Sequence, residues 1–198
     1  MKYTTIIFDF GKVLVDFDYE AVVQRLFPTP ELYELFGRRF CSAEFIRVCD
    51  LGNEPLLDIV RELICIAPEY ESVFEKFDPE GRDLVTGEIP GMRELLGELK
   101  ERGVRLLGLS NWSSMVYPIM KRYDGLFSML EDSLISCEEH MVKPDLCIYE
   151  RLVEKFGLKV DECLFVDDNP ANIAGAKAVG IEGHIFTTTE GLRNFLGM

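Results

Sequence analysis

The clearest pattern along the chain is an alternation of short apolar runs with longer amphipathic segments. Because the apolar runs are almost continuous, they suit strands that are covered on both faces, as in a parallel sheet. The predicted strands are Thr4–Phe8, Val104–Leu109, Asp132–Ser136, Glu162–Val166 and Glu182–Phe186. Between them, apolar residues recur every three or four positions and predict helices. Strands that alternate with helices indicate right-handed crossovers, and so a Rossmann-like, doubly wound parallel α/β sheet.

Capping residues mark the ends of three of these helices. The pattern predicts helices at Gly91–Arg102, Pro144–Phe156 and Pro170–Val179. Gly103 and Gly180 are suitable C-terminal stops, and Asn169 is a good N-cap for the third helix. Pro144 and Pro170 suit the first turn of the second and third helices.

The stretch from residue 19 to residue 84 breaks the alternation, because it has helical patterns and no strand signal. The expected helices are Tyr19–Leu26, Thr29–Gly37 with Pro30 in the first turn, Ala43–Cys49, Glu54–Cys65 after an Asn53 N-cap, and Glu69–Phe77. A structureless loop of this length inside a compact sheet domain is improbable. We therefore interpret residues 19–84 as an inserted all-helical domain, and residues 1–18 and 85–198 as the α/β core domain.

Composition and charge narrow the range of partners. The chain has 198 residues, 47% hydrophobic and 28% charged, which is ordinary for a globular protein. Its formal net charge of −14 repels polyanions, so we expect binding neither to nucleic acid nor to an anionic membrane surface. We expect a monomer or a homodimer.

The N-terminus and the cysteines favour a cytoplasmic protein. The first apolar run is too short for a signal-peptide core, and no stretch approaches the ~20 apolar residues that span a bilayer. The six cysteines lie far apart, with no Cys-x-x-Cys pair. We interpret them as reduced thiols, with zinc binding or a redox pair as the alternative.

Polar side chains follow four of the predicted strands. In open α/β sheets, ligands bind outside the carboxyl ends of the strands, so these side chains should meet at one edge. They are Asp9 after the first strand, Ser110 and Asn111 after the second, Lys143 after the third, and Asp167 and Asp168 after the fourth.

With these groups in this order, the chain resembles the haloacid dehalogenase superfamily, most closely its phosphatase branch with a helical C1-type cap. The resemblance extends over essentially the whole chain, and residues 19–84 stand in the place of the cap. The Asp-x-Gly form of the first motif is similar to that of the sugar-phosphatase group resembling α-D-glucose 1-phosphate phosphatase. The resemblance implies a phosphatase that acts on small phosphorylated metabolites, most of all sugar phosphates.

The resemblance also implies a role for each catalytic residue. Asp9 would form an aspartyl-phosphate, which divides one difficult hydrolysis into two easier steps. Ser110 and the Asn111 backbone would hydrogen-bond the transferring phosphoryl oxygens. Lys143 would neutralise developing charge and orient Asp9. Purely structural alternatives are a turn cap for Asp9, a helix N-cap for Ser110 and a solvated surface position for Lys143.

Charge balance predicts a divalent cation. Asp9, Asp167 and Asp168 would face a phosphate monoester of about −2 with a single lysine to offset them. At ~4 Å and an effective dielectric constant of ~20, each like-charge pair costs roughly 4 kcal/mol. Oxygen ligands and a phosphate substrate favour Mg²⁺. The alternative is that the acidic pair only favours the helix dipole that follows it.

By resemblance, the magnesium ligands would be the Asp9 carboxylate, the Gly11 backbone carbonyl and Asp167, with Asp168 bound directly or through water. Asn172 is a candidate anchor for the acidic loop, or else an exposed helix residue.

The chain departs from the family pattern at Gly11, where most phosphatases of the superfamily carry a second Asp that protonates the leaving group. Such general acid–base help is typically worth about 10²–10⁴-fold. A substrate with a good leaving group, such as an anomeric or acyl phosphate, needs it less. Asp16 or Asp18 is a possible substitute acid, on proximity in sequence alone. The remaining alternatives are a phosphomutase, a catalytically weak phosphate-binding protein and a metal-free 2-haloacid dehalogenase, and the acidic pair argues against the last.

Overall fold

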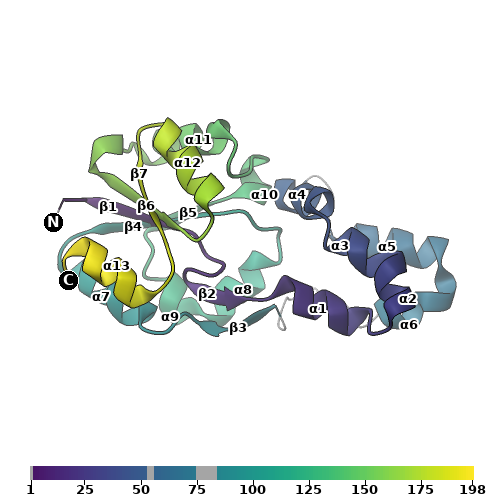
Figure 1. The fold of residues 1–198 in the computed structure, drawn as a ribbon. Helices are drawn as coiled ribbons and strands as arrows, with labels where there is room; N and C mark the ends of the chain where they lie inside the picture. The colour runs from purple at the N-terminus through teal and green to yellow at the C-terminus, as the bar shows by residue number, and fades with distance from the viewer. Residues whose placement is uncertain (1, 53–55, 75–83) are drawn as a thin grey trace.

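A computed structural model of the chain describes residues 2–52, 56–74 and 84–198. Its centre is a five-stranded sheet, parallel throughout, with the strand order β5-β4-β1-β6-β7 (Figure 1). The strands are β1 (Thr5–Phe8), β4 (Arg105–Ser110), β5 (Asp132–Ile135), β6 (Cys163–Asp167) and β7 (Glu182–Ile185). The predicted α/β sheet is confirmed, and each predicted strand end lies within one residue of the observed end. Because β1 lies in the middle, Asp9 follows the central strand.

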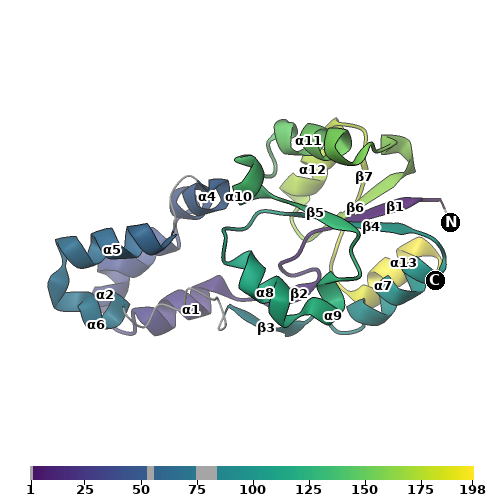
Figure 2. The same ribbon diagram turned by 180° about the vertical axis from the view of Figure 1, so that it is seen from behind.

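Helices cover both faces of the sheet, as the continuous apolarity of the strands predicts. Ile6 and Phe8 of β1 join one apolar cluster, and Ile7 between them joins the other. The first cluster is covered by α7 (Met92–Glu101), α8 (Val116–Arg122), α9 (Asp124–Phe127) and α13 (Thr189–Leu196). The second is covered by α11 (Leu146–Phe156) and α12 (Pro170–Ala178). Figure 2 shows the two groups of helices on opposite sides of the sheet.

Most capping predictions hold. Asn169 caps α12 by accepting a hydrogen bond from the Ala171 amide, and Gly103 and Gly180 have the positive φ angles of helix-ending glycines. The prediction for Pro144 is wrong. Helix α11 begins at Leu146 with Asp145 at its N-cap, so Pro144 lies ahead of the helix in the loop that carries Lys143, joined to it by a cis peptide bond.

Two short strands were missed from the sequence. β2 (Val15–Phe17) and β3 (Val85–Glu88) pair antiparallel where the chain leaves and re-enters the α/β core. Three or four residues are too few to display a strand period. The predicted third strand also ends one residue early, because Ser136 begins a short helix, α10 (Ser136–Glu139).

The described residues between 19 and 74 form helices that extend away from the sheet (Figure 1). They are α1 (Tyr19–Leu26), α2 (Pro30–Leu32), the π-helix η1 (Tyr33–Gly37), α3 (Arg38–Phe40), α4 (Ala43–Leu51), α5 (Leu56–Ile66), the 3₁₀-helix η2 (Pro68–Tyr70) and α6 (Glu71–Phe74). We refer to them as the cap helices. Phe40 packs against Phe27 and Phe45, with ring centroids 5.3 and 4.7 Å away.

The boundaries of some predicted cap helices differ from the observed ones. The helix expected over Thr29–Gly37 continues to Phe40 and contains a π-turn, which periodicity cannot reveal. The predicted Asn53 cap, Glu54 and the end of the last predicted helix at 75–77 lie outside the described residues. In the described ranges no helix is long and apolar enough to cross a bilayer, and the six cysteines are free thiols.

Candidate active site

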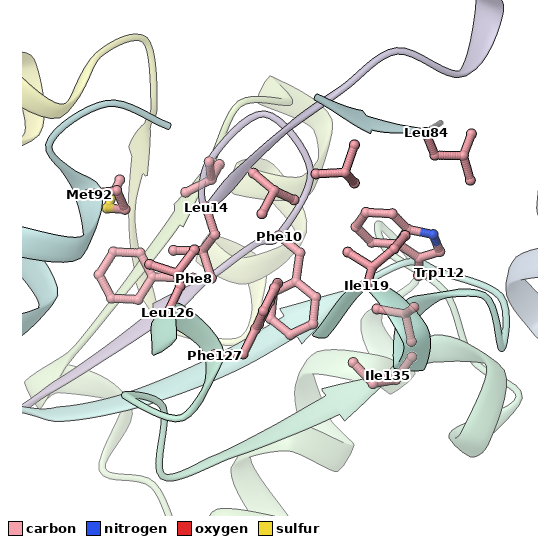
Figure 3. Packing of buried hydrophobic residues seen from close by; sticks show 14 of the residues in the cluster. Phe8, Phe10, Leu14, Leu84, Met92, Trp112, Ile119, Leu126, Phe127 and Ile135 are labelled. Atoms are coloured by element: carbon pink, nitrogen blue, oxygen red, sulfur yellow. The ribbon is translucent and has the colours of Figure 1, made fainter. Parts of the chain in front are cut away.

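The loop after β1 fixes the position of Asp9. The Asp9 amide donates to the Val166 carbonyl across the sheet, at 2.9 Å. The chain then turns back, and the amides of Leu14 and Val15 both donate to the Phe10 carbonyl, at 2.8 and 3.0 Å. Figure 3 shows Phe10 against Phe127, and their rings meet edge to face at 4.9 Å. Backbone hydrogen bonds and the buried Phe10 side chain therefore hold the loop that carries the carboxylate.

Lys143 is the buried cation at the centre of the site. Its Nζ lies 2.8 Å from Asp9 Oδ1 and 2.7 Å from Asp167 Oδ2, and donates to the Leu109 carbonyl at 3.0 Å. The lysine is only 4% exposed, so a solvated surface position is excluded. The ends of β1, β4 and β6 therefore meet on one ammonium group.

The residues after β4 connect Asp9 to the loop of Lys143. The buried Ser110 hydroxyl donates to Asp9 Oδ1 at 2.9 Å, and the next helix begins only at Val116, so Ser110 is not its N-cap. The Asn111 side chain makes two hydrogen bonds with the Lys143 backbone, donating to its carbonyl at 2.9 Å and accepting from its amide at 2.8 Å. This contact between the Asn111 side chain and the loop of Lys143 was not predicted from the sequence.

Asp167 and Asp168 differ in environment. Asp167 is fully buried and accepts hydrogen bonds from the Asn169 amide at 2.8 Å and from Asn172 Nδ2 at 3.0 and 3.1 Å. Asn172 therefore anchors the acidic loop and is not an exposed helix residue. Asp168 is exposed at the mouth of the site. Oxygens of Asp9, Asp167 and Asp168 lie within 4.8 Å of one another, which fits the oxygen ligands of a hard cation.

The electrostatics of the site also fit a divalent cation. Burial and the neighbouring Asp167 raise the pKa of Asp9, although Lys143 lowers it. Burial lowers the pKa of Lys143, but Asp9 and Asp167 more than offset it, so that the pKa is raised overall. Burial and Asp167 raise the pKa of Asp168. Three carboxylates against one ammonium leave negative charge that a bound cation would balance.

Gly11 leaves space at the position where the family resemblance predicts a carboxylate. A Cβ built on Gly11 would meet only Phe17, at 3.8 Å, which is ordinary van der Waals contact. Packing therefore does not require glycine at this position. Asp16 and Asp18 do not replace the missing acid in the pocket: Asp16 accepts from Thr86 and Lys12, and Asp18 caps α1.

A pocket of about 390 Å³ lies between the core and the cap helices. Such a volume is at the lower end of the range for small-molecule sites. Its walls in the core include Asp9, Gly11, Ser110, Asn111 and Asp168, and its walls in the cap helices include Tyr19, Ile46, Cys49 and Asp50. Asp50 was not predicted, because the expected helix ended at Cys49 and nothing in the sequence indicated that its last turn would face the core.

The chain is similar in sequence to a known family model and to curated proteins. A family model described as haloacid dehalogenase-like hydrolase matches residues 3–180. The chain is 32% identical over 92 residues to the sesquiterpene phosphatase astK of Aspergillus oryzae, covering 46% of this chain and 47% of the relative. It is 33% identical over 93 residues to haloacetate dehalogenase H-2 of Moraxella sp., covering 47% and 42%. These matches thus span less than half the length of either curated relative.

A solved structure shares the fold over nearly the whole chain. It is a haloacid dehalogenase family enzyme of Bacteroides thetaiotaomicron in complex with magnesium and inorganic phosphate. The TM-score is 0.72 at 16% identity, over 94% of this chain and 96% of that one. At this identity the likeness establishes the fold alone.

Proposed function

This chain belongs to the haloacid dehalogenase-like hydrolase family, and on that premise we propose that it is a Mg²⁺-dependent phosphatase of small phosphate monoesters. One observation carries the proposal: Ser110 Oγ and Lys143 Nζ converge on Asp9 Oδ1, beside the carboxylates of Asp167 and Asp168. A phosphatase relative and a neighbour bound to magnesium and phosphate support it.

In the proposed reaction Asp9 is the nucleophile. Two donors hold its Oδ1 and so orient the carboxylate, which leaves Oδ2 to attack phosphorus. The bond from phosphorus to the leaving alcohol breaks, and an aspartyl-phosphate forms. Water then attacks the same phosphorus, which releases inorganic phosphate and restores the carboxylate.

The surrounding groups stabilise the negative charge that develops during phosphoryl transfer. Lys143 neutralises the phosphoryl oxygens, and the Asn111 backbone donates a hydrogen bond to them. The Ser110 hydroxyl, which donates its one proton to Asp9 in the free site, turns to a phosphoryl oxygen when the substrate is bound. Asp9, Asp167, Asp168 and the Gly11 carbonyl would hold Mg²⁺, with Asp168 bound directly or through water. When bound, the ion supplies positive charge next to the transferring group.

Sugar phosphates are the substrate class that we favour. The pocket of about 390 Å³ suits a small metabolite, and the Asp-x-Gly motif is similar to that of the sugar 1-phosphate phosphatases. An anomeric phosphate also has a better leaving group than an ordinary alkyl phosphate. Transfer of the phosphoryl group to a sugar, as in a mutase, uses the same covalent intermediate.

Dehalogenation of a 2-haloacid is the second candidate, because one relative is a haloacetate dehalogenase. The reaction uses an aspartate nucleophile and needs no acid for a halide leaving group, which agrees with Gly11. Against it, Asp167 and Asp168 would repel a carboxylate substrate in the absence of a cation.

An activity screen with phosphate esters and with a haloacid separates these functions. The chain is assayed for phosphate release from sugar, nucleotide and acyl phosphates, and for chloride release from chloroacetate, each with Mg²⁺ and with EDTA. Phosphate release that is lost with EDTA and in Asp9→Asn, but kept in Asp18→Asn, supports the phosphatase. Chloride release that EDTA does not affect supports the dehalogenase. A chain that binds phosphate esters but turns over neither substrate is a binding protein, and the proposal fails.

A further inference from the structure

A third carboxylate in the pocket, Asp50, comes from the cap helices and not from the core. The described residues that line the pocket contribute three carboxylates, Asp9, Asp168 and Asp50. Asp9 and Asp168 belong to the acidic cluster that fits a cation, whereas Asp50 does not. Asp50 therefore lines the same pocket as Asp9, but from the cap helices.

The backbone of Asp50 is hydrogen-bonded to the core, and this contact fixes the residue at the pocket. The buried Ser136 hydroxyl donates to the Asp50 carbonyl at 2.7 Å and accepts from the Trp112 amide at 2.9 Å. One side chain of the core thus joins the end of α4 to the segment that follows Ser110. This contact positions Asp50 relative to the catalytic residues after β4.

Two neighbouring contacts fix the same turn. The Leu51 carbonyl lies 2.8 Å from His140 Nδ1. Gly52 has a φ of +69°, and a Cβ there would lie 2.4 Å from the Cys137 carbonyl oxygen. A glycine therefore allows the end of α4 to approach α10 at backbone distance. The position of Asp50 is built into the fold and does not depend on a long flexible side chain.

The state of the Asp50 carboxyl suits proton transfer near neutral pH. In the described part of the chain, it forms no hydrogen bond or ion pair. Burial raises its pKa to about 7; Lys143 opposes this rise and Asp9 adds to it. The other titratable groups that interact with it are Tyr19 of α1 and Cys137 of α10. A general acid performs best when its pKa is close to the working pH.

We propose that Asp50 is the general acid and base of the reaction, and that it supplies from the cap helices the carboxyl that Gly11 lacks. As Asp9 attacks, the phosphorus–oxygen bond of the ester breaks and the Asp50 carboxylic acid gives its proton to the departing oxygen. The Asp50 carboxylate then takes a proton from the water that attacks the aspartyl-phosphate. Both carboxyl groups end in their starting states. This assignment rests on the proposed phosphatase function.

Leaving groups of different basicity test the assignment. Wild type and Asp50→Asn are compared with Mg²⁺ on an alkyl phosphate and on p-nitrophenyl phosphate, whose leaving group needs little protonation. We expect kcat/KM of the variant to fall about 10²–10⁴-fold on the alkyl ester and less than about tenfold on the aryl ester. The decline of the wild-type alkyl rate above a pH of about 7 should vanish in the variant.

Two further variants complete the test. Asp50→Glu, which keeps a carboxyl, should recover part of the alkyl activity, and its folding is checked by its melting temperature. Asp18→Asn is the matched control, because Asp18 is an exposed carboxylate outside the pocket and asparagine also caps a helix. We expect its rates to equal those of wild type on both esters.

The outcomes separate this assignment from the function on which it rests. Equal losses on the two esters in Asp50→Asn would mean that Asp50 only binds substrate or supports the fold, and would overturn the assignment alone. An unchanged alkyl rate would do the same. A wild-type chain that hydrolyses neither ester with Mg²⁺, nor any sugar, nucleotide or acyl phosphate of the screen above, would overturn the phosphatase function and the assignment together.

Discussion

Lys143 is the residue on which the two most buried carboxylates of the site depend. Its ammonium contacts Asp9 at 2.8 Å and Asp167 at 2.7 Å, and its side chain is almost fully enclosed. Removing one partner of a buried ion pair leaves uncompensated charge, which is far more costly than losing the pair as a whole. Lys143 therefore serves the stability of the fold as well as the proposed chemistry.

Replacing Lys143 with methionine tests this dependence. We expect Lys143→Met to lower the free energy of unfolding at neutral pH by about 3–5 kcal/mol, because Asp9 and Asp167 lose their cation. Urea denaturation measures the loss. The control is Lys12→Met, whose exposed pair with Asp16 at 3.3 Å should be worth no more than about 1 kcal/mol. A Lys143→Met protein as stable as the control would contradict a buried, charged site.

At this scale the sequence revealed the groups that follow strands, because the topology of a parallel sheet brings its carboxyl ends together. Asp9, Ser110, Lys143 and Asp167 were found in this way. For Asn111 only a backbone role was predicted, and that role stays a prediction. Its side-chain contact with the Lys143 loop was not predicted, since the path of that loop is not encoded in a local pattern. Asp50 was missed, because its place in the pocket depends on how α4 docks on the core.

The contact between α4 and α10 is the element-scale feature that joins the cap helices to the site. Gly52 ends α4 in the left-handed conformation and lies against the backbone of Cys137. Gly157 ends α11 in the same conformation, with φ of +60°, but has no atom within 4 Å of its Cβ position. Both glycines have a left-handed backbone, but only Gly52 lies against another segment. Comparing substitutions at the two positions therefore separates the cost of the left-handed backbone from the cost of the close contact.

Alanine at these two glycines should have unequal effects. Gly157→Ala should cost about 1–2 kcal/mol of stability from the left-handed backbone alone, with kcat/KM unchanged. Gly52→Ala should cost more, and should lower kcat/KM, because the methyl group must push α4 away from α10 and displace Asp50. Thermal melting and steady-state kinetics measure both effects. Equal losses in the two variants would show that the α4–α10 contact does not position the pocket.

Element prediction succeeded where the hydrophobic pattern was long enough to show a period. The five sheet strands, α7 and α12 lie within one residue or so of their expected bounds. β2 and β3 are too short to show a strand period, so they were not predicted. The π-turn at Tyr33–Gly37 was not predicted either, because the hydrophobic pattern there is that of an ordinary helix. The division at residues 19–84 stays a prediction.

At the scale of the whole molecule, the property that bears most on cation binding is the net negative charge. The chain carries a net charge of −14, and the site adds three clustered carboxylates to one lysine. Folding therefore concentrates like charge at the centre of the carboxyl edge, and a cation bound there should stabilise the folded state. The fold class followed from the sequence, whereas the substrate did not, since the pocket is shared between the core and the cap helices.

Magnesium should raise the melting temperature. At a Mg²⁺ concentration of about 100 times its dissociation constant, linkage predicts about 2.7 kcal/mol, or a rise of about 5–10 °C for a chain of this size. Differential scanning calorimetry with Mg²⁺, and with EDTA plus KCl at equal ionic strength, measures it. Asp168→Asn should reduce the rise, and Asp132→Asn, remote from the acidic cluster, should not. An equal rise with KCl alone would indicate screening instead of a site.

The central claim, that Asp9 carries the phosphoryl group, is tested most directly by trapping the intermediate. The chain is mixed with Mg²⁺ and a phosphate ester that it turns over, quenched during turnover, reduced with borohydride and digested for mass spectrometry. Borohydride converts an aspartyl-phosphate to homoserine, so we predict homoserine at position 9 and at no other aspartate. Turnover with an unmodified Asp9, or with homoserine at another position, would contradict the account.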